Sequence, residues 1–337
     1  MLNLLDILKS PEAHKSELSF IFEHLISEDS SHDDKEKILL TLNSIGINYE
    51  HLASLSKEVL KFSTFTSNLD SDYIDTCGTG GSGKSIFNCS TLSAFTVAAC
   101  GGKVIKHGNR SITSKSGSAD FLERAGINLQ APTDQVLNIY KSMKIAFLFA
   151  PNQHPKLKNV AEVRKNIGVR TIFNVLGPLV NPSKPRFQLL GTSDKKLNKH
   201  MAKALQNNGI KRGMVVTSYS DIDEVCVHEP TFITEINGAK INEWELEPKN
   251  YGFDTCSIED IQVNSLEEAY LFGIEILNGK RGPGLDMVAL NSGVCLYLLS
   301  IVNNLEEGIS LAKKELLSGK VLLKLNMYAK ATNQWIT

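Results

Sequence analysis

The chain has 337 residues, of which 42% are apolar and 22% are charged, as in ordinary globular proteins. Its 36 basic and 37 acidic residues give a net charge of −1, which excludes a general basic surface for nucleic acid or an anionic membrane. No apolar run reaches the roughly 20 residues that span a bilayer. The six cysteines form no Cys-x-x-Cys pair, so we predict neither a zinc cluster nor disulfides. These features predict a cytoplasmic protein with no nucleic acid or membrane partner.

The N-terminal part of the chain has a helical pattern that runs from Leu2 to about Lys61. Leucine and isoleucine recur there at three- and four-residue spacings, as in amphipathic helices. The first residues lack the basic start of a signal peptide. A polar stretch, residues 27–34, separates two helical segments, and Gly46 marks a helix end. Because so short a bundle cannot bury a core alone, we predict a small helical domain, residues 1–66, joined by a returning helical segment at about 160–185.

From Tyr73 onward, short β-prone runs alternate with helical stretches. The runs are residues 73–76, 103–106, 145–149 and 213–217. Such alternation is typical of an α/β fold with a central, mostly parallel sheet flanked by helices. We therefore predict a large α/β domain made of residues 70–159 and 186–337.

Polar segments follow these β-prone runs. They are the glycine-rich loop after residue 77, the loop 106–110, the turn 150–152 and the segment 218–224. Ligands in open α/β sheets bind beyond the carboxyl ends of the strands. We therefore expect all of these segments to form a single composite site.

The glycine-rich loop, Gly78 to Ser85, offers backbone N–H groups that suit a phosphate. It fits G-x-x-x-x-G-K-[ST], the phosphate loop of nucleotide hydrolases. It also reads as Gly-Thr-Gly-Gly followed by Asn-x-Ser-Thr at residues 88–91, a different diphosphate cradle. A hydrolase needs a strand that ends in Asp to hold magnesium, but the nearest candidate, Asp221, lies beyond a polar stretch. The second interpretation is therefore favoured.

Further motifs support the second interpretation. Lys-His-Gly-Asn-Arg occupies residues 106–110, a basic run extends from Arg164 to Pro182, and two carboxylates are adjacent at Asp223 and Glu224. Alone, the motif at residues 106–110 is also consistent with a solvated turn. The adjacent Asp223 and Glu224 are also consistent with a solvated pair of carboxylates on the surface. In this order, and together with Gly-Thr-Gly-Gly, these motifs resemble the anthranilate phosphoribosyltransferase family over essentially the whole chain.

This resemblance implies both a fold and a reaction. The fold is that of nucleoside phosphorylases and phosphoribosyltransferases. The reaction is a glycosyl transfer of tryptophan biosynthesis, in which the phosphoribosyl group of 5-phosphoribosyl 1-diphosphate (PRPP) passes to anthranilate. The cofactor is Mg²⁺, and the small helical domain forms a homodimer. From the residues alone, a bundle that packs only on its own large domain is equally consistent.

The resemblance also implies a PRPP site around the glycine loop. Backbone N–H groups of the loop would hold the diphosphate, and Lys106 would add positive charge. Ser90, Asp223 and Glu224 would hold magnesium, which prefers oxygen ligands. The implied PRPP-binding residues are Gly78, Thr79, Gly80, Gly81, Ser82, Asn88, Ser90, Thr91 and Lys106.

For anthranilate, the resemblance implies that Arg164 binds the carboxylate, since a guanidinium can do so with two parallel hydrogen bonds. Arg170, six residues further on, does not share its helical face and is interpreted as structural. His107 is a candidate general base, but the neutral aromatic amine favours a positioning role. The other implied residues are Gly108, Asn109, Ser118, Gly177 and Pro178, with His154 in the aromatic channel and His228 structural.

One position departs from the family pattern. Ser82 stands where the family carries Asp, and Lys84 lies close by. Both changes make the loop more positive. The sequence therefore does not predict the number of bound metal ions or the affinity for PRPP. Two other relatives of the fold remain as alternatives, a non-catalytic protein that binds nucleic acid and an enzyme that splits nucleosides with phosphate.

Overall fold

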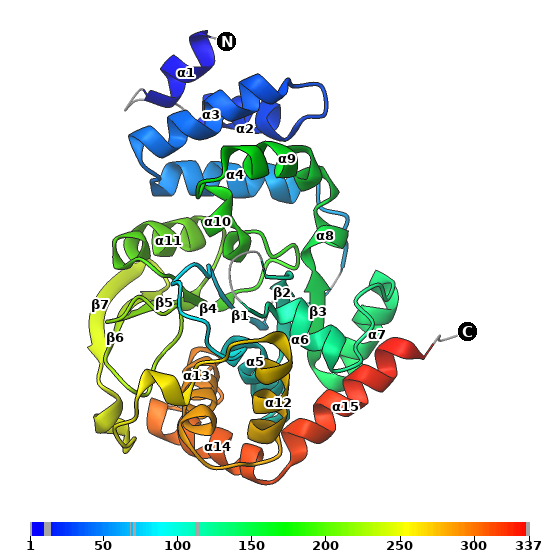
Figure 1. The fold of residues 1–337 in the computed structure, drawn as a ribbon, viewed down its shortest axis with the longest axis vertical. Coiled ribbons are helices and arrows are strands. Elements are labelled where there is room, and N and C mark those ends of the chain that lie inside the picture. The colour runs from blue at the N-terminus through cyan, green and yellow to red at the C-terminus, as the bar shows by residue number, and fades with distance from the viewer. Residues whose placement is uncertain (1, 10–14, 68, 70–71, 112–114, 335–337) are drawn as a thin grey trace.

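The structure is a computed structural model that describes residues 2–9, 15–67, 69, 72–111 and 115–334. It has a group of N-terminal helices above a larger body that is built around one sheet (Figure 1). The strand order is β3-β2-β1-β4-β5-β6-β7. The first five of these strands run parallel, and β6 and β7 are antiparallel. The prediction of an α/β fold with a mostly parallel sheet is confirmed.

The strands are short, and polar loops separate them from the following helices. Their bounds are β1 Ile74–Gly78, β2 Val104–Gly108, β3 Ile145–Phe149, β4 Phe187–Gly191, β5 Arg212–Ser218, β6 Thr231–Asn237 and β7 Lys240–Leu246. The four predicted β-prone runs correspond to β1, β2, β3 and β5. Sequence analysis missed β4, which lies at the centre of the sheet, and the β6–β7 hairpin, whose turn carries an Asn-Gly pair.

The N-terminal helices are α1 Leu2–Lys9, α2 Lys15–Ile26, α3 His32–Ile45 and α4 Tyr49–Lys61. The side chain of Ser31 caps α3 by accepting a hydrogen bond from Asp34 N. Gly46 follows α3 with φ 82°, a left-handed conformation that glycine adopts without strain. The predicted helix end at Gly46 is thus confirmed, while the predicted polar break ends earlier than expected, at the Ser31 cap.

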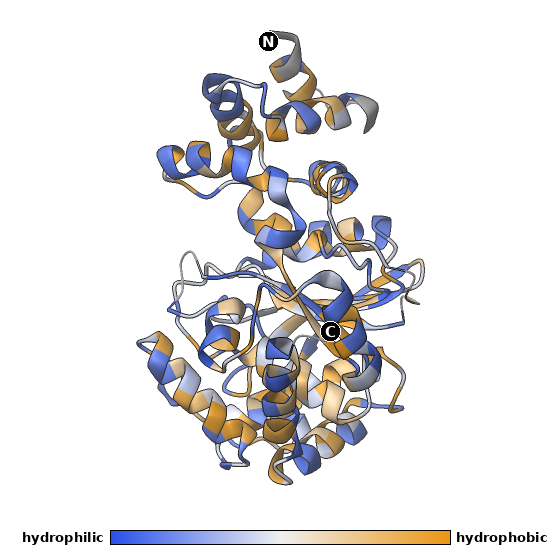
Figure 2. Ribbon diagram, turned by 90° about the vertical axis from the view of Figure 1, so that its right-hand side faces the viewer, coloured by the Kyte–Doolittle hydropathy of each residue, from blue (hydrophilic) through white to orange (hydrophobic). Residues whose placement is uncertain are grey.

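The remaining helices are α5 Cys89–Ala99, α6 Ser118–Arg124, α7 Thr133–Met143, α8 Ala150–Gln153, η1 Pro155–Val160, α9 Ala161–Ile167, α10 Phe173–Leu176, η2 Gly177–Leu179, α11 Lys195–Asn207, η3 Pro248–Tyr251, η4 Ile258–Asp260, α12 Leu266–Leu277, α13 Pro283–Leu298, α14 Leu305–Leu317 and α15 Lys320–Asn333. Most of the remaining helices surround the sheet, whereas α9 and α10 pack with the N-terminal helices. Polar and apolar residues alternate along most of these helices (Figure 2), as amphipathic helices require.

Two large apolar cores lie in the molecule. One joins the sheet to α5, α13 and the C-terminal helices. The other joins α2–α4 to α9, α10 and α11 and includes Leu190 of β4 and Val215 of β5. Val163 and Leu176 of the returning segment are buried in that second core beside Leu25 and Leu39. The N-terminal helices therefore pack on residues of the sheet as well as on the returning segment.

Two global features complete the description. All six cysteines are free. Among the helices of the described segments, none combines the length and the apolar character needed to cross a membrane.

Candidate functional site

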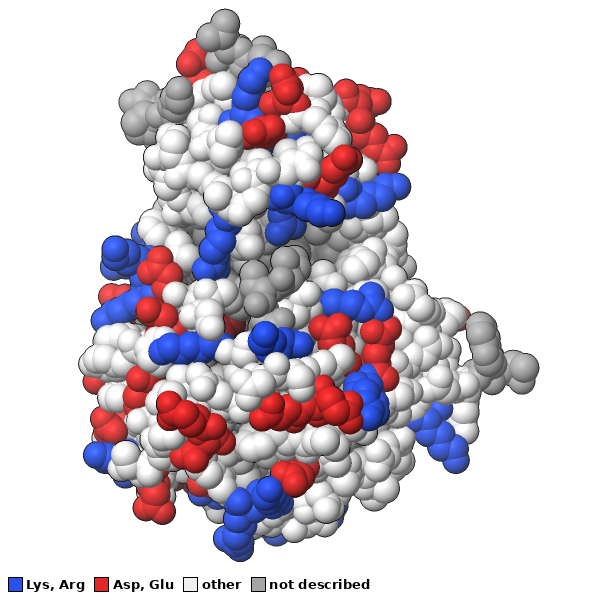
Figure 3. Space-filling model, in the orientation of Figure 1, with Lys and Arg blue, Asp and Glu red and all other residues white. Residues whose placement is uncertain are grey.

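A cavity of about 350 Å³ opens beyond the carboxyl ends of β1, β2 and β3. Its walls come from the glycine loop, the loop after β2, the returning segment and the loop after β5. Lys and Arg side chains lie on both sides of the waist between the N-terminal helices and the body around the sheet (Figure 3). Every residue that sequence analysis assigned to PRPP, anthranilate or magnesium lines this one cavity. What each of these residues binds stays a prediction.

The glycine loop is held from two sides. Gly80 and Gly81 have φ values of 66° and 87°, in the left-handed region that favours glycine. Gly80 N donates a hydrogen bond to Asp223 Oδ2 at 2.7 Å, and Arg170 Nη1 donates to Gly81 O at 3.2 Å. A Cβ on Gly81 would lie 2.6 Å from the Arg170 guanidinium. Arg170 lies beyond the end of α9 and supports the loop from outside the cavity.

This loop does not have the geometry of a nucleotide-hydrolase phosphate loop. In such a loop the helix begins directly after the glycines. Here residues 82–88 stay irregular, and α5 begins only at Cys89. The Lys84 ammonium donates instead to Ser220 O at 2.8 Å. The nucleotide-hydrolase interpretation is therefore not supported.

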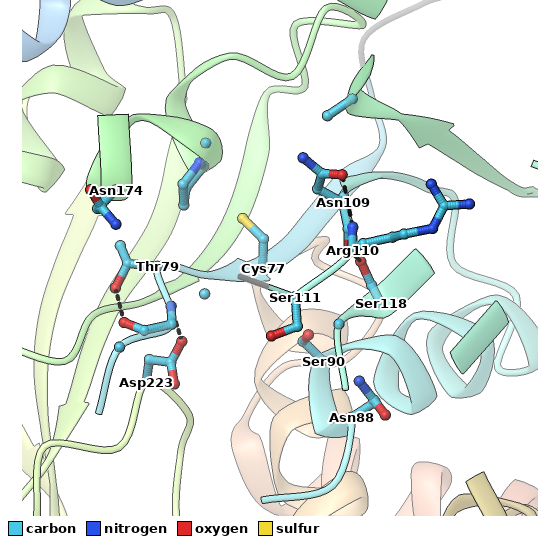
Figure 4. Close-up of a pocket in the computed structure, with 18 of the residues that line it drawn as sticks. Cys77, Thr79, Asn88, Ser90, Asn109, Arg110, Ser111, Ser118, Asn174 and Asp223 are labelled. Atoms are coloured by element: carbon cyan, nitrogen blue, oxygen red, sulfur yellow. Dashed lines mark hydrogen bonds between the residues drawn. The ribbon is translucent and has the colours of Figure 1, made fainter. Parts of the chain in front are cut away.

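The adjacent carboxylates Asp223 and Glu224 face the glycine loop and the start of α5. Glu224 Oε1 accepts a hydrogen bond from Ser90 N at 3.0 Å, at the positive end of the helix dipole. A Cβ on Gly78 would overlap Asp223 Oδ2, so glycine at this position lets Asp223 approach the strand end. In Figure 4, Asp223 and Thr79 lie on one side of the cavity and Ser90 lies at its floor.

The electrostatics of these carboxylates fit a divalent cation. Loss of solvent raises the pKa of Asp223, and it raises the pKa of Glu224 to about 8, with the neighbouring Asp223 charge as the next cause. Two crowded carboxylates whose ionised forms are disfavoured gain most from a positive ion between oxygen ligands. The donor set of Asp223, Glu224 and Ser90 consists of oxygen atoms only, as Mg²⁺ prefers.

Lys106 lies at the end of β2, buried between the glycine loop and α5. Its ammonium donates to Ser90 Oγ at 3.2 Å and to Thr76 O. Beneath it lies Asp75, fully buried, with its pKa raised by burial to about 6. Asp75 accepts hydrogen bonds from Asn181 Nδ2 at 2.9 Å and from His107 N at 3.3 Å. Asp75 was not predicted from the sequence, because its hydrogen-bond partners come from two distant segments.

The opposite half of the cavity is more apolar. The Arg164 guanidinium carbon lies 5.3 Å from the centre of the Phe173 ring, and burial lowers the pKa of Arg164. Among the residues that the structure describes, no carboxylate forms an ion pair with it. Gly177 and Pro178 complete this wall. A half-buried guanidinium beside an aromatic ring is suited to a planar aromatic acid.

Two histidines line the cavity between its halves, with their rings edge to face and 5.1 Å apart. His154 Nε2 donates to Val180 O at 2.8 Å, and burial lowers the pKa of His154 to about 4. Burial, followed by the proximity of His154, places the pKa of His107 well below its usual value. Both rings are therefore neutral near pH 7, and the role of His154 in binding the aromatic substrate stays a prediction.

The structure adds residues that sequence analysis did not assign. Asn174, Phe173 and Ser116 also line the cavity. Ser116 Oγ donates to Asn88 Oδ1 at 2.9 Å, so Asn88 is held in place from the loop after β2. Phe173 and Asn174 lie within the run from Arg164 to Pro182, but no individual role was predicted for them from the sequence. Within that same loop, residues 112–114 of the predicted ligand segment lie outside the described residues.

The polar side chains of the loop after β2 point in two different directions. Asn109 and Ser118 lie together, and Ser118 Oγ donates to Asn109 O at 3.3 Å (Figure 4). Arg110 Nη2 pairs with Glu123 at 2.6 Å, so its charge is already balanced. Arg110 and Lys106 both line the cavity, but the Arg110 guanidinium is paired with Glu123, whereas the Lys106 ammonium lies at Ser90 Oγ.

Comparison with known proteins shows similarity over nearly the whole chain. Residues 70–322 match the model of the glycosyl transferase family, a/b domain. The chain is 40% identical to anthranilate phosphoribosyltransferase of Petrotoga mobilis, over 97% of this chain and 95% of that one. The crystal structure of the Thermus thermophilus anthranilate phosphoribosyltransferase is 31% identical, with a TM-score of 0.92 over 99% and 100% of the two chains.

A eukaryotic relative is similar as well. The structure of the Saccharomyces cerevisiae anthranilate phosphoribosyltransferase in complex with PRPP and Mg is 26% identical, with a TM-score of 0.88 over 98% of this chain and 97% of that one. The same enzyme has been solved in complex with 4-fluoroanthranilate. From this likeness over nearly its whole length, the chain belongs to the anthranilate phosphoribosyltransferase family.

Proposed function

We propose that the protein transfers the phosphoribosyl group of PRPP to the amine of anthranilate, giving N-(5-phosphoribosyl)anthranilate and diphosphate in tryptophan biosynthesis. One observation carries the proposal. A single cavity joins a phosphate-binding half, built from the glycine loop, Lys106 and paired carboxylates, to an aromatic half with Arg164. The Saccharomyces cerevisiae relative, solved with PRPP and Mg and with 4-fluoroanthranilate, supports both halves.

In the phosphate half, the diphosphate would lie against backbone N–H groups of residues 78–82 and the ammonium of Lys106. Asn88, Ser90 and Thr91 would hold ribose and phosphate oxygens at the positive end of α5. The Thr91 hydroxyl is buried in the cavity wall and has no hydrogen-bond partner in the described part of the chain. Such a free hydroxyl is suited to a ligand oxygen.

Asp223, Glu224 and Ser90 would hold Mg²⁺ in this half. When bound, Mg²⁺ offsets the negative charge that grows on the departing diphosphate. The chain itself supplies the rest of the charge stabilisation through Lys106 and fixed backbone dipoles, which need no reorganisation during the reaction. Asp223 also keeps the glycine loop in place through its bond from Gly80 N.

In the aromatic half, Arg164 would bind the anthranilate carboxylate and so direct the amine toward the anomeric carbon. Asn109, Gly108 and Ser118 would border the amine, and Pro178 and Gly177 would cover the ring. The low pKa of His107 makes its imidazole a weak base. We therefore propose that His107 positions the amine, and that the amine proton passes to solvent after the carbon–nitrogen bond has formed.

The test is the loss of anthranilate fluorescence after PRPP and Mg²⁺ are added to the purified protein. We expect a loss that requires both additions and that nearly disappears in Arg164→Ala. Arg281→Ala, at an exposed position outside the cavity, is the matched control and keeps full activity. If anthranilate fluorescence were not lost at any magnesium concentration, the proposed reaction would be contradicted. A different amine acceptor would then be tested.

We also propose the two domains described above and a homodimer formed through the small helical domain. Phe20 of α2 and Leu40 of α3 are large apolar side chains that stay exposed there, and Val169 beyond α9 is exposed as well. Exposed apolar groups of this size favour contact with a second copy. Light scattering on Phe20→Asp should then report a monomer, whereas an unchanged mass for wild type and variant would contradict this interface.

A further inference from the structure

The loop between β5 and β6 has a second side that the proposed reaction does not use. Asp223 and Glu224 face the cavity, whereas Cys226, His228 and Glu229 are absent from its lining. One ligand atom of each of these three residues, a sulfur, a ring nitrogen and a carboxylate oxygen, lies within 4.8 Å of the other two. Three different donors thus converge behind the loop that carries the paired carboxylates.

The surroundings of the His228 ring also indicate a ligand at this position. Its side chain is 8% exposed, and both ring nitrogens are buried without a hydrogen-bond partner in the described part of the chain. Nε2 lies 3.4 Å from Glu229 Oε1. A buried imidazole whose ring nitrogens have no hydrogen bond is costly, because each has lost its contact with water. The ring is therefore placed to gain from a ligand between itself and Glu229.

The charge states of the two polar donors favour a cation. Burial, as the largest cause, lowers the pKa of His228, while Glu229 and Glu259 oppose this shift and Lys84 adds to it. Burial opposes ionisation of Glu229, but hydrogen bonds from Ser218 and Ser220 outweigh it and lower its pKa. Ser220 N donates to Glu229 Oε1 at 2.8 Å. A neutral imidazole beside a fixed carboxylate is a common pair of metal ligands.

We propose that Cys226, His228 and Glu229 bind one divalent cation of the zinc class, separate from the magnesium ligands. Sulfur and nitrogen donors select zinc over magnesium, which takes oxygen ligands. On binding, the Cys226 S–H bond breaks, its proton leaves to solvent, and a metal–sulfur bond forms without any change of oxidation state. Three protein ligands leave the fourth tetrahedral position to water.

The cation would fasten the loop that carries Asp223 and Glu224. Cys226 N already donates to Thr231 Oγ1 at 3.1 Å, at the start of β6. A metal bonded to Cys226, His228 and Glu229 would tie the centre of this loop to its end. The spacing of the cysteines predicted no zinc cluster because only one cysteine takes part. The other two ligands come from His228 and Glu229.

Cobalt(II) titration of the chelator-treated full-length protein tests the site directly, since a cobalt–thiolate bond gives a near-ultraviolet charge-transfer band. We expect this band at one equivalent of cobalt, and its displacement by zinc. Cys226→Ser should abolish it, and Cys256→Ser, which lies outside the cluster, should keep it. His228→Gln, which leaves the buried thiol in place, should weaken cobalt binding by at least the roughly 10–100-fold that even loss of an outer-sphere partner costs.

Two further arms make the outcome decisive. Asp223→Asn should retain the band, because the proposed zinc site does not use this carboxylate. Zinc should raise the melting temperature of the wild type and leave that of His228→Gln unchanged, since only the intact site gains binding free energy. The absence of a cobalt–thiolate band in the wild type, or its survival in Cys226→Ser, would overturn the proposal. Neither arm measures turnover, so its result is independent of the proposed reaction.

Discussion

The two halves of the cavity are organised in different ways. The phosphate half is held by hydrogen bonds between segments that are distant in the sequence. Examples are the bonds from Gly80 N to Asp223 and from Ser90 N to Glu224. The aromatic half is held by packing, with Arg164 against Phe173 and two histidine rings edge to face. The first half is a rigid set of dipoles and charges, and the second is a shaped wall with one guanidinium. A substitution in the phosphate half should therefore weaken PRPP binding, and one in the aromatic half should weaken anthranilate binding.

The largest effect is expected for Gly78→Ala. The new Cβ overlaps Asp223 Oδ2, so the carboxylate and the glycine loop must move apart. Misplacement of this kind costs about 100-fold in kcat/KM, and we expect most of it to appear as weaker use of PRPP. Steady-state kinetics with PRPP varied measures this, and an unchanged KM for anthranilate serves as the internal control. Wild-type kinetics in this variant would show that Asp223 is not tied to the strand end.

Arg164→Ala should have the next largest effect on the reaction. Removing a charge-assisted pair costs about 1.5–3 kcal/mol, which corresponds to roughly a 10–150-fold rise in KM for anthranilate. PRPP binding, measured by calorimetry, should stay as in the wild type, because Arg164 lies in the other half of the cavity. Arg164→Lys should recover only part of the loss, since an ammonium lacks the paired geometry. An equal loss for both substrates would instead indicate a structural role for Arg164.

The buried Asp75 gives a pH-dependent effect on stability. Its pKa is raised from 3.8 to about 6 in the folded protein, so the fold binds this proton more tightly than the unfolded chain does. Its contribution is therefore present below about pH 4 and is lost as the pH rises through 6, by roughly 3 kcal/mol. Asp75→Asn should remove this part of the pH dependence. Urea unfolding of both proteins at pH 4 and pH 7 measures the difference, and parallel pH profiles would contradict it.

The smallest effect concerns the departure of this chain from the family pattern. Lys84 is half-buried and bonded to Ser220 O, so it joins the glycine loop to the loop that carries Asp223. For Lys84→Met we expect about a 2–5-fold rise in KM for PRPP, as for a partly exposed charge. Ser82→Asp, which introduces a carboxylate beside the retained lysine, should shift the magnesium optimum. No change in either variant would mean that this loop charge is not used.

The sequence predicts most of the phosphate half because its residues lie in short local motifs. Gly-Thr-Gly-Gly, Lys106 and Asp223-Glu224 are each recognised without knowledge of the fold, and all line the cavity. Asp75 escaped prediction because its role depends on Asn181 and on His107 N, more than 30 residues further along the chain. Strand β4 escaped because its buried Gln188 interrupts the apolar pattern. Gln188 Nε2 donates to Pro178 O, a partner that only the fold supplies.

The cavity residues that had no assigned role and the proposed zinc ligands are harder to predict for the same physical reason. Asn174 and Ser116 reach the cavity through turns whose shape no motif reports. Cys226, His228 and Glu229 form no recognised metal-binding pattern in the sequence, and the conformation of the β5–β6 loop brings their ligand atoms together. Packing decides these positions, and single-sequence patterns carry little information about packing.

Whether the cavity has two separately organised halves can be measured by varying both substrates in Gly78→Ala and Arg164→Ala side by side. We expect a crossed pattern, in which Gly78→Ala loses PRPP affinity and Arg164→Ala loses anthranilate affinity. Equal weakening of both substrates in both variants would show that the two halves act as one unit.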